Sequence, residues 1–258
     1  MKLNQGKDTL IVVQSVGGYE QMCRNNRALW EHHGLPVVVL SPTDKPCIVE
    51  GMACAQVGRD QHAGPISIER WQRMLEWCLR QPYDYFFLTE SDAVCLEPEL
   101  PLWLWGIHSC DLRFWSNEMP DNAAPPRQQF YCIAPYFFHR SLAQRILNIS
   151  QLVPCGEPQH GDRWIGLMLE AGSIPHQKFS PGIGCGTLDP VNRRDEFQQV
   201  LAVVRSQGAP FIHGIKTPEV RDALVRAYAD WKADTSRNRS RRIFAPPRYF
   251  DRDKVVGK

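Results

Sequence analysis

The first 90 residues alternate short apolar runs with amphipathic segments, and this alternation limits the fold more than any other feature of the sequence. The runs at 8–16, 36–40 and 83–88 are rich in β-branched and aromatic residues, which predicts buried strands. The segments 19–33 and 67–81 predict helices, the second because its apolar residues recur every three or four positions. Strands that alternate with helices predict an α/β fold with parallel strands.

The second half of the chain predicts shorter and less regular elements. They are strands at 112–116, 131–138 and 211–212, and helices at 140–149, 163–171 and 218–231. A length of 258 residues suits one domain with additions, so residues 1–236 are predicted to form a single domain. Residues 237–258 hold eight of the 30 Lys and Arg residues and two of the 28 acidic residues, which predicts a basic C-terminal tail.

The nine cysteines are widely spaced, and no two of them form a C-x-x-C pair. This spacing argues against a structural zinc site and against a disulfide framework. Cys78, Cys95 and Cys132 lie in apolar stretches, where a free thiol behaves as a small buried hydrophobic group. No apolar run approaches the ~20 residues that cross a bilayer. We therefore expect a cytoplasmic protein without a membrane span, from a bacterium or a phage-infected host cell.

An acidic segment, Glu90-Ser91-Asp92, follows the apolar strand predicted at 83–88. In parallel α/β sheets ligands collect at the carboxyl ends of strands. Two carboxylates one residue apart can both reach one divalent cation and present it to a diphosphate. The same segment also suits a polar turn in which Ser91 or Asp92 caps the next element. The segment alone leaves both interpretations open.

The order of these segments resembles the GT-A class of nucleotide-sugar glycosyltransferases. The resemblance is carried by the strand that ends near Asp44, by Glu90-Ser91-Asp92, and by the segments 130–141, 161–167 and 211–216, over ~200 residues in all. It implies a GT-A-like (Rossmann-like) mixed sheet flanked by helices, and a metal-dependent glycosyltransferase. Glu90 stands where this class more often has Asp, so the subfamily and the retaining or inverting outcome stay open.

The leaving group of a nucleotide sugar is a diphosphate, whose developing charge a metal and a cation can neutralise. The expected ligands of Mn²⁺ or Mg²⁺ are Glu90, Asp92 and His213, and Lys216 is the expected cation at the diphosphate of a donor such as a UDP-sugar. For His213 the alternative is a core or capping histidine, and for Lys216 a solvated lysine.

Two further acids have weaker assignments. Asp162 is the expected catalytic base for the acceptor hydroxyl, because it opens the helix predicted at 163–171, although an Asp in that place is also an ordinary N-cap. Asp44 follows the second strand and either binds the ribose or base of the donor or shapes a turn.

The acceptor is open. The basic tail favours an anionic acceptor such as hydroxymethylated pyrimidine in DNA, and a cytosolic glycan or a lipid-linked sugar is the alternative. A sugar nucleotidyltransferase is disfavoured, because residues 14–20 after the first strand contain no basic residue. A non-catalytic nucleic-acid-binding module is the remaining alternative, and it predicts strongly salt-dependent binding without turnover.

Overall fold

A computed structural model of the chain describes residues 8–15, 20–42, 53–58, 65–97, 100, 113–119, 131–153, 161–179, 182–183 and 188–237. Asp44 and the tail beyond Arg237 lie outside these ranges. The expectations for both are therefore not addressed by the structure.

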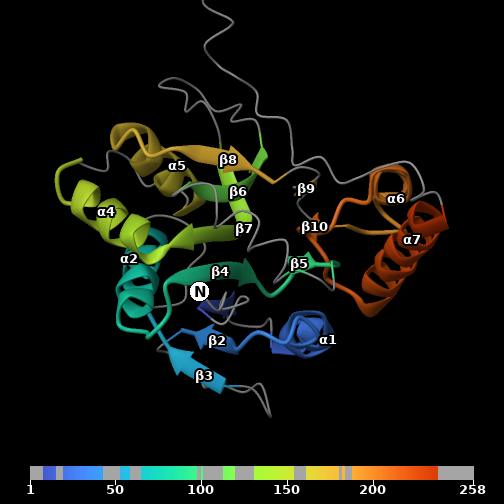
Figure 1. Cartoon of the computed structure of the whole chain (residues 1–258), viewed down its shortest axis with the longest axis horizontal. Coiled ribbons are helices and arrows are strands. Elements are labelled where there is room, and N and C mark those ends of the chain that lie inside the picture. The colour runs from blue at the N-terminus through green and yellow to red at the C-terminus, as the bar shows by residue number, and fades with distance from the viewer. Residues whose placement is uncertain are drawn as a thin grey trace, which may run out of the picture.

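A seven-stranded mixed sheet forms the centre of the molecule (Figure 1). In pairing order its strands are β3 (Ala53–Gln56), β2 (Val37–Ser41), β1 (Thr9–Gln14), β4 (Tyr85–Glu90), β7 (Tyr131–His139), β6 (Phe114–Met119) and β8 (His176–Lys178). Strand β7 is antiparallel to both of its neighbours, whereas the other adjacent pairs are parallel. The α/β class and the mixed sheet expected from the sequence are confirmed.

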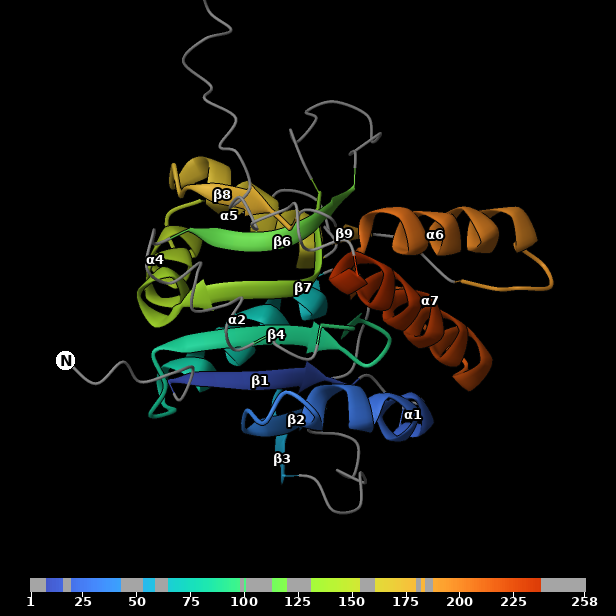
Figure 2. The same ribbon diagram turned by 45° about the vertical axis from the view of Figure 1, so that its right-hand side comes forward.

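Helices cover both faces of this sheet (Figure 2). One face carries α2 (Pro65–Leu79), α4 (Arg140–Ser150) and α5 (Gly161–Ala171), and the other carries α1 (Glu20–Glu31). Successive side chains of a strand point to opposite faces. Accordingly, Leu10 and Val12 of β1 pack in the core beneath α2, whereas Ile11 and Val13 pack in the core beneath α1. Burial on both faces explains why β1 reads as a continuous apolar run.

A second, three-stranded sheet lies beyond the carboxyl end of β4 (Figure 1). Its strands are β5 (Val94–Cys95), β10 (Phe211–Ile212) and β9 (Gly182–Ile183). Helices α6 (Arg194–Gln207) and α7 (Pro218–Arg237) pack on each other and on this sheet in a third hydrophobic cluster. The N–H of Ile215 donates to the carbonyl of Asp92 at 2.8 Å, which joins the chain after β10 to the turn after β4.

The sequence correctly predicted the long elements and missed short ones. All the strands and helices expected within the described residues are present, with shifted ends, whereas β3, β5, β8, β9 and α6 were not expected. The strands that were missed are two to four residues long, too short to show a pattern. Helix α6 did carry a signal: its buried residues Phe197, Val200, Leu201 and Val204 have helical spacing, and Gly208 ends it in the left-handed conformation.

The cysteines agree with the sequence interpretation only in part. Cys23, Cys78, Cys95 and Cys132 are free and buried, as expected for those in apolar stretches. Cys54, in the edge strand β3, is instead disulfide-bonded. The expectation against disulfides therefore does not hold at Cys54, whereas the free thiols expected at Cys78, Cys95 and Cys132 are present. Among the described helices, none is both long and apolar enough to cross a membrane.

Candidate functional site

The acidic segment lies where β4 leaves the sheet. Glu90 is the last residue of the strand, and Asp92 follows in the turn that leads to β5. The backbone fixes this turn, because the N–H of Ser91 donates to the carbonyl of Gln14 at 3.1 Å and the N–H of Ala93 to the carbonyl of Glu90 at 3.0 Å. The two carboxylates are therefore held by a hydrogen-bonded turn at the carboxyl edge of the parallel strands.

His213 and Lys216 reach the same two carboxylates from the chain after β10. Nε2 of His213 lies 3.0 Å from Oε2 of Glu90 and 3.6 Å from Oδ1 of Asp92. Nζ of Lys216 lies 3.4 Å from the other oxygen of Asp92, Oδ2. One ligand atom each from Glu90, Asp92 and His213 lies within 4.8 Å of the others. We call these three residues the acid–histidine cluster.

Gly214 shapes the segment that delivers His213 and Lys216. Its φ of 93° is accessible to glycine but strained for a residue with a side chain. Its carbonyl accepts a hydrogen bond from the N–H of Leu188 at 3.0 Å, which fixes this conformation. The glycine thus permits the backbone path by which both side chains contact Asp92.

Asp92 is the most buried member of the cluster, with a side chain 9% exposed, against 16% for His213 and 28% for Glu90. Burial raises the pKa of Asp92; His213 and Lys216 lower it, and Glu90 raises it further. With the imidazole of His213 counted as neutral, the form that binds a metal, two carboxylates against one lysine leave a negative excess in a partly desolvated place. A bound cation would relieve this excess.

The donor set fits a hard divalent cation. Carboxylate oxygens are the ligands that Mg²⁺ and Mn²⁺ prefer, and Mg²⁺ takes oxygen ligands almost alone. The imidazole of His213 adds one nitrogen ligand to the two carboxylates. The three ligand atoms already lie close enough to converge on one ion.

Asp162 lies in a second polar group beneath α5. Its Oδ1 accepts a hydrogen bond of 2.7 Å from the hydroxyl of Tyr136 in β7, whose side chain is fully buried. Burial, together with the charges of Asp162 and Glu90, raises the pKa of Tyr136 well above its usual value, so the phenol stays protonated and donates. The Tyr136 hydroxyl is therefore influenced by the charge of Glu90 while it donates its hydrogen bond to Asp162.

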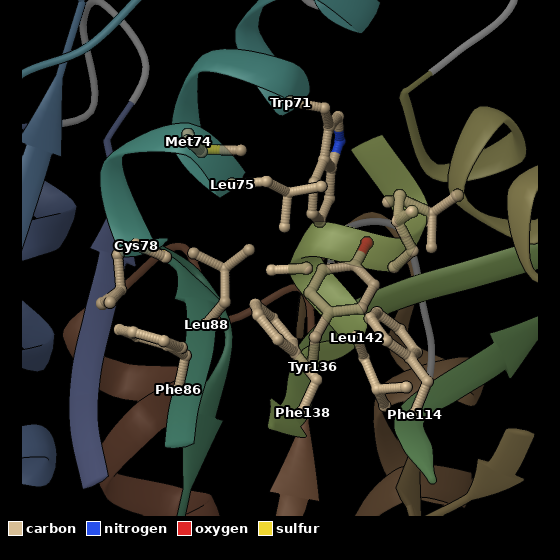
Figure 3. Close-up of a cluster of buried hydrophobic side chains, with 14 of the residues drawn as sticks. Trp71, Met74, Leu75, Cys78, Phe86, Leu88, Phe114, Tyr136, Phe138 and Leu142 are labelled. Carbon is tan, nitrogen blue, oxygen red and sulfur yellow. The ribbon is translucent and has the colours of Figure 1, made fainter. Parts of the chain in front are cut away.

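Helix α2 supports this arrangement from above the sheet. Trp71 meets the ring of Tyr136 edge-on, with centroids 5.0 Å apart (Figure 3). The N–H of Gly161, the first residue of α5, donates to Oγ of Ser67 at 3.1 Å. A Cβ at Gly161 would lie 2.2 Å from Cδ1 of Trp71, so this position requires glycine. The start of α5, and with it Asp162, is thus placed by contacts with α2.

The structure brings Glu90, Asp92, His213 and Lys216 together and places Asp162 with Tyr136. Asp44 is not among the described residues. The functional roles of all these residues stay predictions. Tyr136 was not recognised from the sequence, because an aromatic residue within an apolar strand reads as core.

The likenesses of this chain to known proteins are distant. No protein-family model and no curated protein match the chain. The apo form of glycosyltransferase GlyE from Streptococcus pneumoniae TIGR4 is 10% identical, with a TM-score of 0.47 over 89% of this chain and 64% of that chain. 4-Diphosphocytidyl-2C-methyl-D-erythritol synthase is 12% identical, with a TM-score of 0.47 over 76% of this chain and 99% of that chain.

This chain thus spans less than two thirds of the pneumococcal protein. The α/β class of this chain therefore rests on its own mixed sheet, in which β7 is antiparallel among parallel strands and helices cover both faces.

Proposed function

We propose that this protein is a metal-dependent glycosyltransferase, which moves a sugar from a nucleotide-sugar donor to a hydroxyl acceptor. The observation that carries the proposal is the acid–histidine cluster at the carboxyl edge of the sheet, with Lys216 on the second oxygen of Asp92. This edge is where α/β folds bind their ligands. A cation site beside a lysine suits a diphosphate, because both neutralise the charge that the leaving group gains.

The roles follow from the positions of the side chains. Glu90, Asp92 and His213 would hold Mn²⁺ or Mg²⁺, which when bound stabilises the negative charge of the departing nucleoside diphosphate. Lys216 adds a second positive charge beside Asp92. With two carboxylates, one lysine and a neutral imidazole, the same residues repel a diphosphate when no metal is bound. Donor binding is therefore expected to depend on the metal.

Asp162 is the proposed base that accepts the proton of the acceptor hydroxyl. It lies in the first turn of α5, where an acid also stabilises the start of a helix, so the proposal depends on its contact with Tyr136. The hydrogen bond from Tyr136 restrains its carboxylate. A base held in one orientation is more effective than a mobile one, because less freedom is lost in the transition state.

The donor is proposed to be a UDP-sugar, and Asp44 is the candidate for its ribose or base. The acceptor proposal rests on the basic tail at 237–258, which favours a polyanion such as hydroxymethylated DNA. A cytosolic glycan or a lipid-linked sugar is the alternative acceptor.

A donor-hydrolysis screen tests the proposal. The protein is incubated with single nucleotide sugars plus Mn²⁺ or EDTA, and release of the nucleoside diphosphate is measured. We expect release with Mn²⁺ only, and a loss of more than about 100-fold in Asp92→Ala. The control is Glu76→Ala, which removes a carboxylate from the exposed surface of α2.

If the nucleoside diphosphate is released at an undiminished rate in EDTA, or by Asp92→Ala, the reaction does not depend on a metal at this site. Release of pyrophosphate from a nucleoside triphosphate and a sugar phosphate would instead support a nucleotidyltransferase.

A further inference from the structure

Asn26 lies in the middle of α1, and its side chain is 1% exposed. Its Nδ2 atom lies 2.8 Å from the carbonyl oxygen of Ser91 and 3.4 Å from that of Ile215. An amide nitrogen carries two hydrogens, so one side chain can donate to both carbonyls. Asn26 therefore bridges two segments that lie 65 and 189 positions away from it in the sequence.

Both carbonyls belong to the segments that carry the candidate ligands. Ser91 lies between the two acidic residues of the acid–histidine cluster, and Ile215 lies between its histidine and Lys216. The N–H of Ile215 also donates to the carbonyl of Asp92 at 2.8 Å. The Asn26 amide and this backbone hydrogen bond thus join the two segments at the site, next to the pairing of β5 with β10.

Helix α1 is anchored by other side chains as well. Nε1 of Trp30, which is 1% exposed, donates to the carbonyl of Ala93 at 3.3 Å. Arg221 of α7 donates to the carbonyl of Asn25. Loss of the Asn26 amide would therefore leave helix α1 in place and loosen the turn at Ser91 against the segment at Ile215.

We propose that Asn26 is a positioning residue of the metal site, which holds the turn after β4 and the segment after β10 at the separation that the three ligands require. This inference rests on the proposed function. Groups that orient the ligands of a metal, without touching the metal, typically change its affinity by about 10- to 100-fold when they are removed. The carbonyls of Ser91 and Ile215 are buried, and each loses a hydrogen-bond partner when the amide is removed. The cost of removing the amide is therefore larger than it would be at the surface.

Two variants test the role. Asn26→Leu keeps a similar volume without the donor, and Asn26→Ala removes it with a residue that favours helix. Mn²⁺ is titrated into each full-length protein by calorimetry, well below its Tm. We expect a Kd for Mn²⁺ about 10- to 100-fold weaker than that of the unsubstituted protein. In donor hydrolysis the Mn²⁺ concentration at half-maximal rate should rise by the same factor, while kcat at saturating Mn²⁺ falls less.

The matched control is Tyr228→Phe, which removes a buried hydroxyl that donates to Oε2 of Glu97 at 2.6 Å. This control should lower Tm and leave the Kd for Mn²⁺ unchanged. Asn26 variants that behave like the control, with a lower Tm and an unchanged Kd, would overturn the inference and leave the proposed function standing. Absence of Mn²⁺ binding by the unsubstituted protein would overturn both.

Discussion

Replacing Tyr136 with phenylalanine removes the hydroxyl that holds Asp162. This hydroxyl donates to Oδ1 of Asp162 at 2.7 Å and lies 3.3 Å from the carbonyl of Cys132. The aromatic ring would keep its packing, with its centroid 5.0 Å from that of Trp71 and 6.0 Å from that of Phe114. The core volume therefore stays the same, and the change isolates the hydrogen bond.

The magnitude follows from the kind of bond that is lost. A hydrogen bond to a charged group contributes about 1.5–3 kcal/mol to stability. With a shift of about 2–4 °C per kcal/mol for a chain of this size, Tm should fall by about 3–12 °C. A positioned base contributes about 10²- to 10⁴-fold to a rate, so loss of its restraint should lower kcat by about 10-fold or more.

The assay compares Tyr136→Phe with Tyr228→Phe, because each substitution removes one buried phenolic hydroxyl that donates to a carboxylate. Thermal melts, kcat and the Kd for Mn²⁺ are measured for both. We expect both variants to lose stability, both to keep the metal affinity, and only Tyr136→Phe to lose kcat. A normal kcat in Tyr136→Phe, despite a lower Tm, would refute the positioning of Asp162 as a base.

Three further outcomes are expected. In EDTA at pH 7, Asp92→Asn should raise Tm, because burial raises the pKa of Asp92 and its ionised form costs stability. Thermal melts should show this gain in Tm vanish as the pH falls to about 3.9, the pKa of an unfolded aspartate, and a gain in Tm that does not change with pH would contradict this reasoning. Gly161→Ala should cost about 1–3 kcal/mol in unfolding experiments and lower kcat, because its Cβ would meet Trp71; normal values of both would count against the placement of α5. Deleting residues 238–258 should weaken DNA binding and flatten its salt dependence in filter-binding assays, without loss of donor hydrolysis; unchanged DNA binding would exclude the tail as the contact.

The α/β class and the long strands and helices were predictable from the sequence because these elements carry strong patterns, whereas the strand order was not predicted. Strand β1 is buried on both faces and is apolar throughout, and α2 repeats apolar residues at helical spacing. The two acids at the end of β4 were predictable for a related reason, since a strand end is where a parallel sheet binds its ligands. His213 and Lys216 came from a resemblance, and only the structure shows that they contact Asp92.

Tyr136 and Asn26 were not predictable, because their importance lies in contacts distant in sequence. A tyrosine in an apolar strand has the pattern of a core residue, and its hydroxyl meets an acid 26 positions later. An asparagine in a polar stretch of α1 has the pattern of a solvent-facing residue, yet Asn26 is buried against two carbonyls. Sequence periodicity reports which face a residue occupies and carries no information on such partners.

The central claim is that the acid–histidine cluster binds a divalent cation and that the bound cation accepts a nucleoside diphosphate. Calorimetric titration of UDP into the full-length protein tests this claim most directly, once with Mn²⁺ and once with EDTA. We expect measurable binding with Mn²⁺, none with EDTA, and none with Mn²⁺ in the Asp92→Ala variant. Equal affinity for UDP with Mn²⁺ and with EDTA would contradict the claim.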